Sequence, residues 1–175
     1  MFIDTSLAFS SFTTPQAVTT TADATTVIDI TGAGSGNAPA LVFGKNAVPT
    51  MVFGADWGSG GGGTVPYVYL FVTTAGSTAN TFTVSLSGMI DNGSNAPGTA
   101  TVMYQSAAFV GTSLTKGSVL SFQMPPLAPG QAPPRFYKLT YTCSGSLTVS
   151  VSAGIVINPQ NSLTGTLYPN NFLAV

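Results

Sequence analysis

Residues 137–143 read Tyr-Lys-Leu-Thr-Tyr-Thr-Cys, and this stretch decides the fold class of the chain. Aromatic or aliphatic residues and cysteine occupy every second position, and lysine or threonine occupies each position between them. A period of two is that of a β-strand with one face in a core and the other face in solvent. The stretch therefore predicts a half-buried strand with hydroxyl groups on its outer face, and it predicts a buried, inert thiol at Cys143.

The same alternation recurs on both sides of this stretch, in residues 82–87, 120–124 and 147–153. Residues 67–72 differ because they are apolar on both faces, which is typical of a central strand or of one covered by a partner. No segment keeps a helical apolar period over three turns, and residues that favour helices on protein surfaces are scarce. The chain is therefore predicted to be all-β.

Turn-forming residues separate the predicted strands at the positions where the chain must reverse. They are Gly76–Asn80, Asp91-Asn92-Gly93, Pro97-Gly98, Lys116-Gly117 and Ser144-Gly145. Short strands with this punctuation are typical of two-layer β architectures. We expect a jelly-roll-like β-sandwich of about eight strands that occupies residues 1–157.

Among the segments that do not fit this pattern of strands and turns, two are long. Residues 36–65 contain a run of glycines around a few aromatic side chains, and we interpret them as a loop region inserted into the sandwich. Residues 158–175 follow Asn158-Pro159 and form a predicted C-terminal arm. The apolar residues of the arm have neither helix nor strand spacing, so we expect it to dock on a neighbouring subunit or on a partner protein.

Candidate interface residues lie in these two segments, because Trp, Tyr and Phe often anchor protein interfaces. They are Phe43, Phe53, Trp57, Leu167, Tyr168, Phe172 and Leu173. Two interpretations stay open for them. The aromatic side chains could fold back onto their own domain, or they could anchor on a partner protein or a sister subunit.

The composition argues against several function classes. Only 5% of the 175 residues are charged, the net charge is -1, and the chain has no Glu and no His. General acid–base catalysis and metal binding rely mainly on His, Cys, Asp and Glu, so we expect neither an enzyme nor a metal or cofactor site. Nucleic acid and anionic membranes would find few cations to contact. Ser and Thr make up about a quarter of the chain, which suits packing against other protein.

Two motifs match functional patterns by their letters only. Gly58–Gly63 satisfies G-x-G-x-x-G, but Val65-Pro66 and a predicted strand follow where a dinucleotide site needs a helix. Asp91–Asn95 faintly resembles a calcium loop, but the chain has no Glu for its last ligand, so a turn is favoured. One cysteine and an N-terminus without signal-peptide features predict a protein made in a reducing cytoplasm.

Several segments, taken in order, are similar to the capsid cement, or staple, proteins of short-tailed bacteriophages. The resemblance covers most of residues 1–157, while residues 36–65 and the long tail after residue 157 are additional. The segments that carry it are residues 1–19, Thr26–Gly34, Tyr67–Thr73, Leu127–Gly130, Arg135–Tyr141, Ser144-Gly145 and Val151–Val156.

This resemblance implies a non-enzymatic virion protein on the outer face of an icosahedral capsid. Its implied partners are the major capsid protein and itself, as a dimer or a trimer. Two alternatives stay open: another virion component such as a tail or fibre protein, and a carbohydrate-binding β-sandwich that uses Trp57 as a platform. A hydrolase is the third class, and it would need a pair of Asp side chains in a cleft.

Overall fold

The computed structural model describes residues 7–29, 66–125, 132 and 134–157. These residues form eleven β-strands and one short 3-10 helix, η3 (Gly111–Ser113). Three of the strands have two residues each, which leaves eight longer ones. The strands are β1 (Ala8–Ser10), β2 (Gln16–Val18), β3 (Ala22–Asp23), β4 (Ile28–Asp29), β5 (Pro66–Thr74), β6 (Thr81–Asp91), β7 (Pro97–Gln105), β8 (Phe109–Val110), β9 (Val119–Gln123), β10 (Phe136–Cys143) and β11 (Val149–Ile157).

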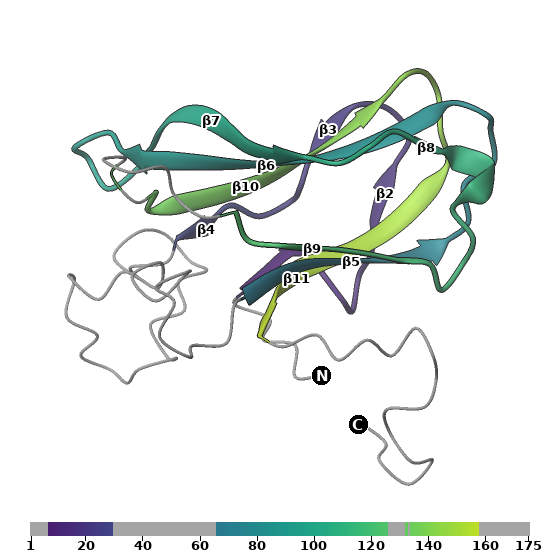
Figure 1. The fold of residues 1–175 in the computed structure, drawn as a ribbon, viewed down its shortest axis with the longest axis horizontal. Coiled ribbons are helices and arrows are strands. Elements are labelled where there is room, and N and C mark those ends of the chain that lie inside the picture. The colour runs from purple at the N-terminus through teal and green to yellow at the C-terminus, as the bar shows by residue number, and fades with distance from the viewer. Residues whose placement is uncertain (1–6, 30–65, 126–131, 133, 158–175) are drawn as a thin grey trace, which may run out of the picture.

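Two antiparallel sheets pack face to face, so the predicted all-β sandwich is confirmed (Figure 1). The five-stranded sheet has the order β1-β11-β5-β9, with β2 also paired to β11. The six-stranded sheet has the order β3-β10-β6-β7, with β4 paired to β10 and β8 paired to β6. The chain passes back and forth between the two sheets, which is compatible with a jelly roll.

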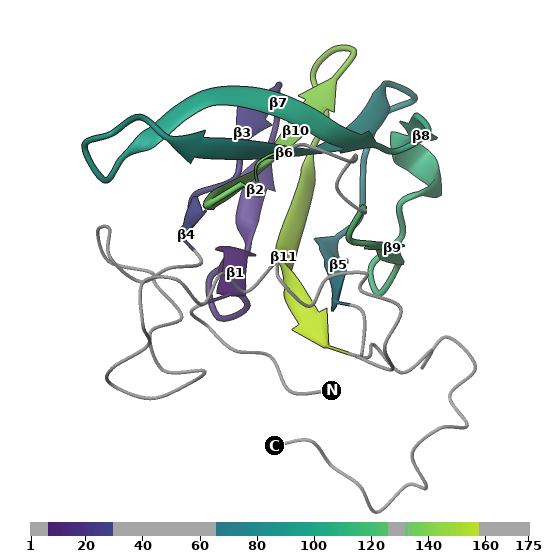
Figure 2. The same cartoon turned by 60° about the vertical axis from the view of Figure 1, so that its left-hand side comes forward.

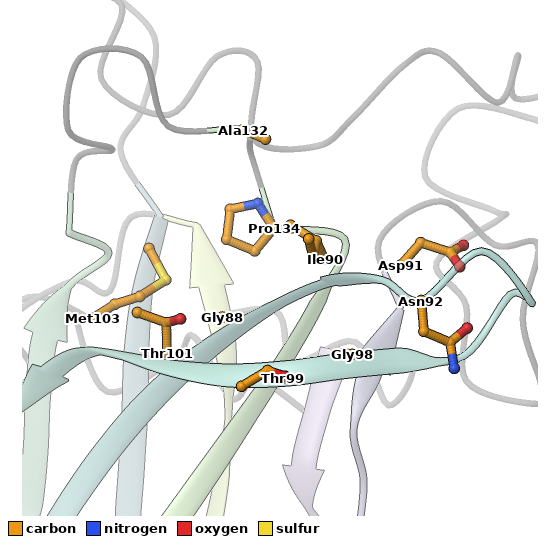
Figure 3. Close-up of a pocket in the computed structure, with 10 residues that line it drawn as sticks. All are labelled: Gly88, Ile90, Asp91, Asn92, Gly98, Thr99, Thr101, Met103, Ala132 and Pro134. Carbon is orange, nitrogen blue, oxygen red and sulfur yellow. The ribbon is translucent and has the colours of Figure 1, made fainter.

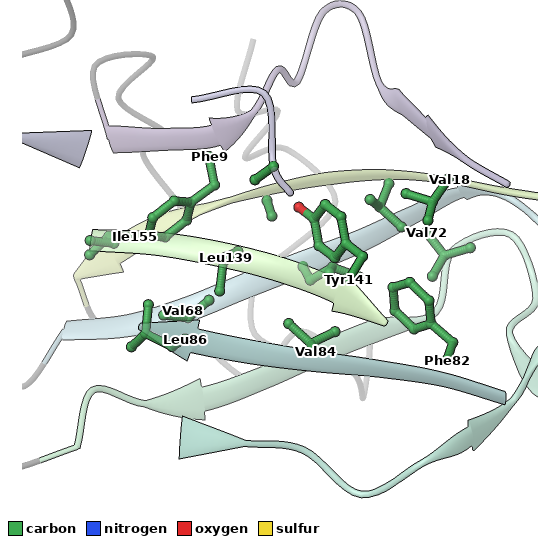
Figure 4. Close-up of a cluster of buried hydrophobic side chains, with 14 of the residues drawn as sticks. Phe9, Val18, Val68, Val72, Phe82, Val84, Leu86, Leu139, Tyr141 and Ile155 are labelled. Carbon is green, nitrogen blue, oxygen red and sulfur yellow. The ribbon is translucent and has the colours of Figure 1, made fainter. Parts of the chain in front are cut away.

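The alternation in β10 places its apolar side chains in the core, as the sequence predicts. Leu139 pairs with Leu86 of β6, and Tyr141 pairs with Val84. All four side chains are at most 2% exposed, and they contact the inward side chains of the other sheet (Figure 4). The residues between them carry hydroxyl groups on the outer face. Hydrophobic burial between two pleated faces therefore accounts for the register of this pair of strands.

β5 is a central strand, which confirms one of the two interpretations of residues 67–72. It pairs with β11 on one side and with β9 on the other. Val68, Leu70 and Val72 point into the core and are almost completely buried. Tyr67 and Phe71 lie on the opposite face and are half-buried. β5 thus has a neighbouring strand on each edge, and its side chains are buried on one face and at least half-buried on the other up to Thr73, which accounts for the apolar residues on both faces.

The predicted turn at Pro97-Gly98 is wrong, because these two residues begin β7. The reversal is complete before them. Asp91 Oδ1 accepts hydrogen bonds from the backbone N–H groups of Gly93 (2.8 Å) and Asn95 (3.1 Å), and Asn95 has a positive φ of 57°. Asp and Asn side chains close turns in this way, and proline fits the first residue of an edge strand.

The predicted division of the chain concerns segments that lie mostly beyond the described residues. β11 ends at Ile157, which is also the last residue of the predicted sandwich domain, residues 1–157. The predicted insertion, residues 36–65, and the predicted arm, residues 158–175, both lie outside the described residues. Across the part of the chain that the structure describes, no helix is long and apolar enough to cross a membrane.

Candidate interaction surface

All seven candidate interface residues lie outside the part of the chain that the structure describes. They are Phe43, Phe53, Trp57, Leu167, Tyr168, Phe172 and Leu173. The carbohydrate-binding alternative also depends on Trp57. The surface of the sandwich itself therefore supplies the structural observations on function.

Arg135 forms the main charged cluster, at the start of β10. Its Nε and Nη2 atoms donate hydrogen bonds to the two carboxylate oxygens of Asp29, at 3.0 and 2.9 Å. Its Nη1 atom pairs with Asp91 and donates to the side-chain oxygen of Asn95 at 2.9 Å. The guanidinium group also lies 4.7 Å from the centre of the Phe136 ring. This cluster joins β4, β10 and the β6–β7 turn.

Asp29 dominates the electrostatics of the cluster. Its hydrogen bonds and charge, with a smaller contribution from Asp91, raise the pKa of Arg135 above its ordinary value. The Arg135 and Asp29 side chains are 13% and 5% exposed, respectively. A bidentate Arg–carboxylate pair at such low exposure fixes geometry and leaves little charge to attract a partner.

A second, more exposed ion pair lies on the outer face of the six-stranded sheet. Asp23 accepts hydrogen bonds from Thr140 Oγ1 at 2.7 Å and from Lys138 Nζ at 3.0 Å. The hydrogen bond from Thr140 and the charge of Lys138 together lower the pKa of Asp23. Five of the six charged side chains among the described residues are thus engaged in ion pairs within the chain, and the sixth, Lys116, is exposed.

Hydroxyl groups cover much of the outer face of the six-stranded sheet, as the sequence predicts. Thr83 pairs with Thr142, and Ser85 pairs with Thr140, across β6 and β10. Hydroxyl groups can exchange hydrogen bonds with water for hydrogen bonds with a partner at a smaller desolvation cost than charges. This face is therefore suited to close contact with another protein.

A depression of about 550 Å³ lies where the β6–β7 hairpin projects (Figure 3). Ile90, Met103 and Pro134 supply much of its apolar lining, and Ile90 is 55% exposed. A Cβ atom at Gly88 would lie 2.6 Å from both Met103 Sδ and Pro134 Cγ, so only glycine permits this packing. Asp91 is the one ionisable side chain among the described lining residues, and it is held by Arg135. The depression thus offers apolar and hydroxyl contacts.

A smaller cavity of about 260 Å³ opens between the two sheets, beside β7, β8 and β9. The rings of Tyr104 on β7 and Phe122 on β9 stack across this gap, with their centres 3.9 Å apart. Phe109 of β8 also lines the cavity. The stacked aromatic pair connects the edge strand of one sheet to the edge strand of the other.

Two predictions about reactive or ligating groups can be compared with the geometry. Cys143 is half-buried, so the prediction that it is buried is wrong. It ends β10 at the rim of the sandwich, where the core offers less cover, but partial burial still raises the pKa of its thiol. Asp91–Asn95 forms the expected turn. Among the described residues, no group of three or more His, Cys, Asp and Glu could hold a metal ion.

Sequence reasoning did not single out β7 or the Arg135 cluster. β7 lacks a clean alternation because its pairing with β6 shifts register twice. The members of the Arg135 cluster are far apart in the chain, so no local motif marks them.

A comparison with protein-family models finds no family that matches the chain. A comparison with curated proteins finds no significant match either.

Proposed function

We propose that this protein is a structural virion protein that binds the outer face of an icosahedral phage capsid and fastens neighbouring major capsid subunits. The observation that carries the proposal is the internal pairing of its few charges. Arg135 is held by Asp29 and Asp91, and Lys138 is held by Asp23. The remaining described surface is rich in hydroxyl and small apolar groups, which favours dense packing on another protein.

The sandwich architecture also supports this proposal. A well-packed β-sandwich is a rigid platform, so it loses little conformational entropy when it binds. A capsid presents many identical sites, and a self-associated protein that engages several of them gains strong attachment from modest individual contacts. The resemblance of most of residues 1–157 to capsid cement proteins points to the same role, and it implies jelly-roll connectivity and a location on the virion surface.

The decisive experiment measures how many copies of the protein are present per major capsid protein in purified particles. The proposal expects a simple fraction of the capsid lattice. A dozen or fewer copies per particle would instead indicate a tail or fibre component. Particles that lack the protein should still assemble, and they should release DNA at a lower temperature than complete particles. Failure of shells to form without it would assign it to the shell or the scaffold.

Salt dependence provides an independent test of the surface argument. Because the described charges are mostly paired within the chain, rebinding of purified protein to depleted particles should change little between low and high ionic strength. A steep loss of binding with salt would show that attachment depends on charge.

The predicted arm can be tested in the same rebinding assay. A chain that ends at Ile157 should keep the melting temperature of the full-length protein and bind fewer copies per particle. Replacing Trp57, Tyr168 or Phe172 with Ala should act in the same direction if these side chains anchor on a partner. A large fall in the melting temperature would show instead that they pack on their own domain.

A further inference from the structure

The free edge of the six-stranded sheet is unusual in its length and composition. β7 is nine residues long, and no other described strand pairs with its outer side. Figure 2 shows it along the outer border of the sheet. The strand contains no charged residue, and its Val102 side chain is 59% exposed. Charges are one of the devices by which natural edge strands avoid pairing with another chain, and β7 lacks them.

The other described edges are shorter, and some lie near charges. β1 has three residues and is buried, and β3 has two residues, of which Asp23 is exposed and charged. β9 has five residues and begins three positions after the exposed Lys116. β7 is therefore the longest uncharged edge in the part of the chain that the structure describes.

The hydrogen-bonding groups of β7 can be assigned from its register with β6. Ser106 donates its backbone N–H to the carbonyl of Val84, so Val84 directs its backbone groups toward the β7 side. Backbone direction alternates along a strand, so Gly88 also faces β7, and Gly88 pairs with Thr101. Thr101 therefore directs its backbone groups to β6, and Ala100 and Val102 direct theirs to the free edge.

Register shifts flank this central stretch on both sides. One lies between Val102 and Tyr104, and the other lies between Pro97 and Ala100. Such bulges bend and twist a strand and interrupt further pairing. They leave Ala100–Val102 as the regular segment, with Thr101 at its centre. Tyr104, stacked on Phe122 of the other sheet, holds one end of the segment in place.

We infer that β7 pairs antiparallel with β7 of a second copy, about a two-fold axis at Thr101. In this arrangement Ala100 of each copy lies opposite Val102 of the other and exchanges backbone hydrogen bonds with it. Both side chains are small and uncharged, so the strand can meet itself without repulsion. The interface is isologous and closes as a dimer, and the bulges limit its extension.

The choice of a second copy follows from this symmetry. A free strand edge selects an extended chain as its partner. A two-fold axis at Thr101 places Ala100 of one copy opposite Val102 of the other, so the free backbone donors and acceptors of the two edges pair with each other. The proposed function includes self-association of the protein. The present inference rests on that self-association and specifies the strand through which it occurs. It is tested on isolated protein, and the capsid role is tested on particles, so the two can fail separately.

The first test measures the molar mass of the full-length protein by light scattering at micromolar concentration. The wild type should be a dimer, and Val102→Lys should weaken dimerisation about tenfold or more, because it adds a like charge from each copy at diagonal positions about 7–8 Å apart beside the axis. Ile90→Lys is the matched control, since Ile90 is also an exposed aliphatic residue but lies off this edge. It should leave dimerisation unchanged. A wild-type monomer or trimer, or equal effects of the two variants, would overturn the inference.

The second test probes the position of the axis by cross-linking. Residues directly opposite in a non-hydrogen-bonded antiparallel pair have Cα atoms about 4.5 Å apart, within the range that a disulfide spans. Thr101→Cys in a Cys143→Ser background should therefore form a covalent dimer on mild oxidation. Thr142→Cys, on an exposed position of β10, is the control and should stay monomeric in a denaturing gel. Absence of a Thr101→Cys cross-link would overturn the two-fold axis at that residue.

Discussion

Arg135 and Asp29 are 106 positions apart in the chain, yet they form a bidentate pair with distances of 3.0 and 2.9 Å. The pair joins the start of β10 to the end of β4 beside the β6–β7 turn. Planar guanidinium and carboxylate groups match each other well in this bidentate geometry. The relationship thus fixes the relative positions of three segments, and it leads to the first prediction.

Replacing Arg135 with Met should destabilise the fold by about 3 kcal/mol, because it leaves a nearly buried Asp29 carboxylate without its main cation. Arg135→Lys should recover only part of this loss, since an ammonium group cannot form the bidentate pair. The measurement is urea unfolding at neutral pH. Lys138→Met is the control, because its partner Asp23 has a side chain that is 53% exposed, and it should cost at most about 1 kcal/mol. Equal losses in the two variants would contradict the prediction.

Stability should fall in alkaline solution because of two buried tyrosines. Burial raises the pKa of Tyr137 and of Tyr141 well above the ordinary value. The folded state therefore keeps protons that the unfolded chain releases above pH of about 10. The stabilisation is complete below that pH and is lost as pH rises further. Tyr141→Phe should flatten the alkaline part of the profile measured by denaturant unfolding, and an unchanged profile would contradict this account.

The Tyr141 hydroxyl also has a role at neutral pH. It shares a buried hydrogen bond of 2.7 Å with Ser10 Oγ, which connects β10 to β1 across the core. Tyr141→Phe should cost about 1 kcal/mol and leave the Ser10 hydroxyl with Gln16 as its partner. Ser10→Ala should cost a similar amount, and the double variant should cost less than the sum. Strict additivity in the unfolding free energies would show that the two hydroxyls do not interact.

Gly88→Ala should destabilise the sandwich by about 1–3 kcal/mol through overpacking. The added methyl group would lie 2.6 Å from Met103 Sδ and from the Pro134 ring. Met103→Ala in the same chain should relieve part of the strain, because the flexible thioether is removed while the rigid proline ring stays. Thermal unfolding of both single variants and the double variant measures this coupling. A Gly88→Ala protein as stable as the wild type would contradict the packing described for the depression.

The Cys143 thiol should react slowly with disulfide reagents in the folded protein. Its pKa is raised by partial burial, so less thiolate is present at neutral pH than in an unfolded chain. The reaction rate should rise with pH and increase sharply in denaturant. Fast modification at neutral pH, at the rate of a free peptide thiol, would contradict the raised pKa.

Local patterns in the sequence determined the fold class and several strands of this protein. The alternation at Tyr137, Leu139 and Tyr141 predicts a strand with one buried face. In a helix, residues at this spacing would point to different sides, and some of these large apolar side chains would be exposed to water, which is unfavourable. The apolar run at residues 67–72 likewise predicts a strand, but it leaves open whether that strand is central or covered by a partner. These inferences depend only on neighbours in the chain and on the period of two.

Only the tertiary structure decided how the strands meet and which edge stays open. The Asp91 side chain accepts hydrogen bonds from the backbone of residues 93 and 95, so the chain has reversed before it reaches Pro97. Pro97 therefore begins β7, although its sequence context predicts a turn. The pairing of Arg135 with Asp29 and the uncharged edge at Thr101 depend on contacts between distant segments. Such contacts follow from the packing of two sheets around one core, and no local pattern in the sequence encodes them.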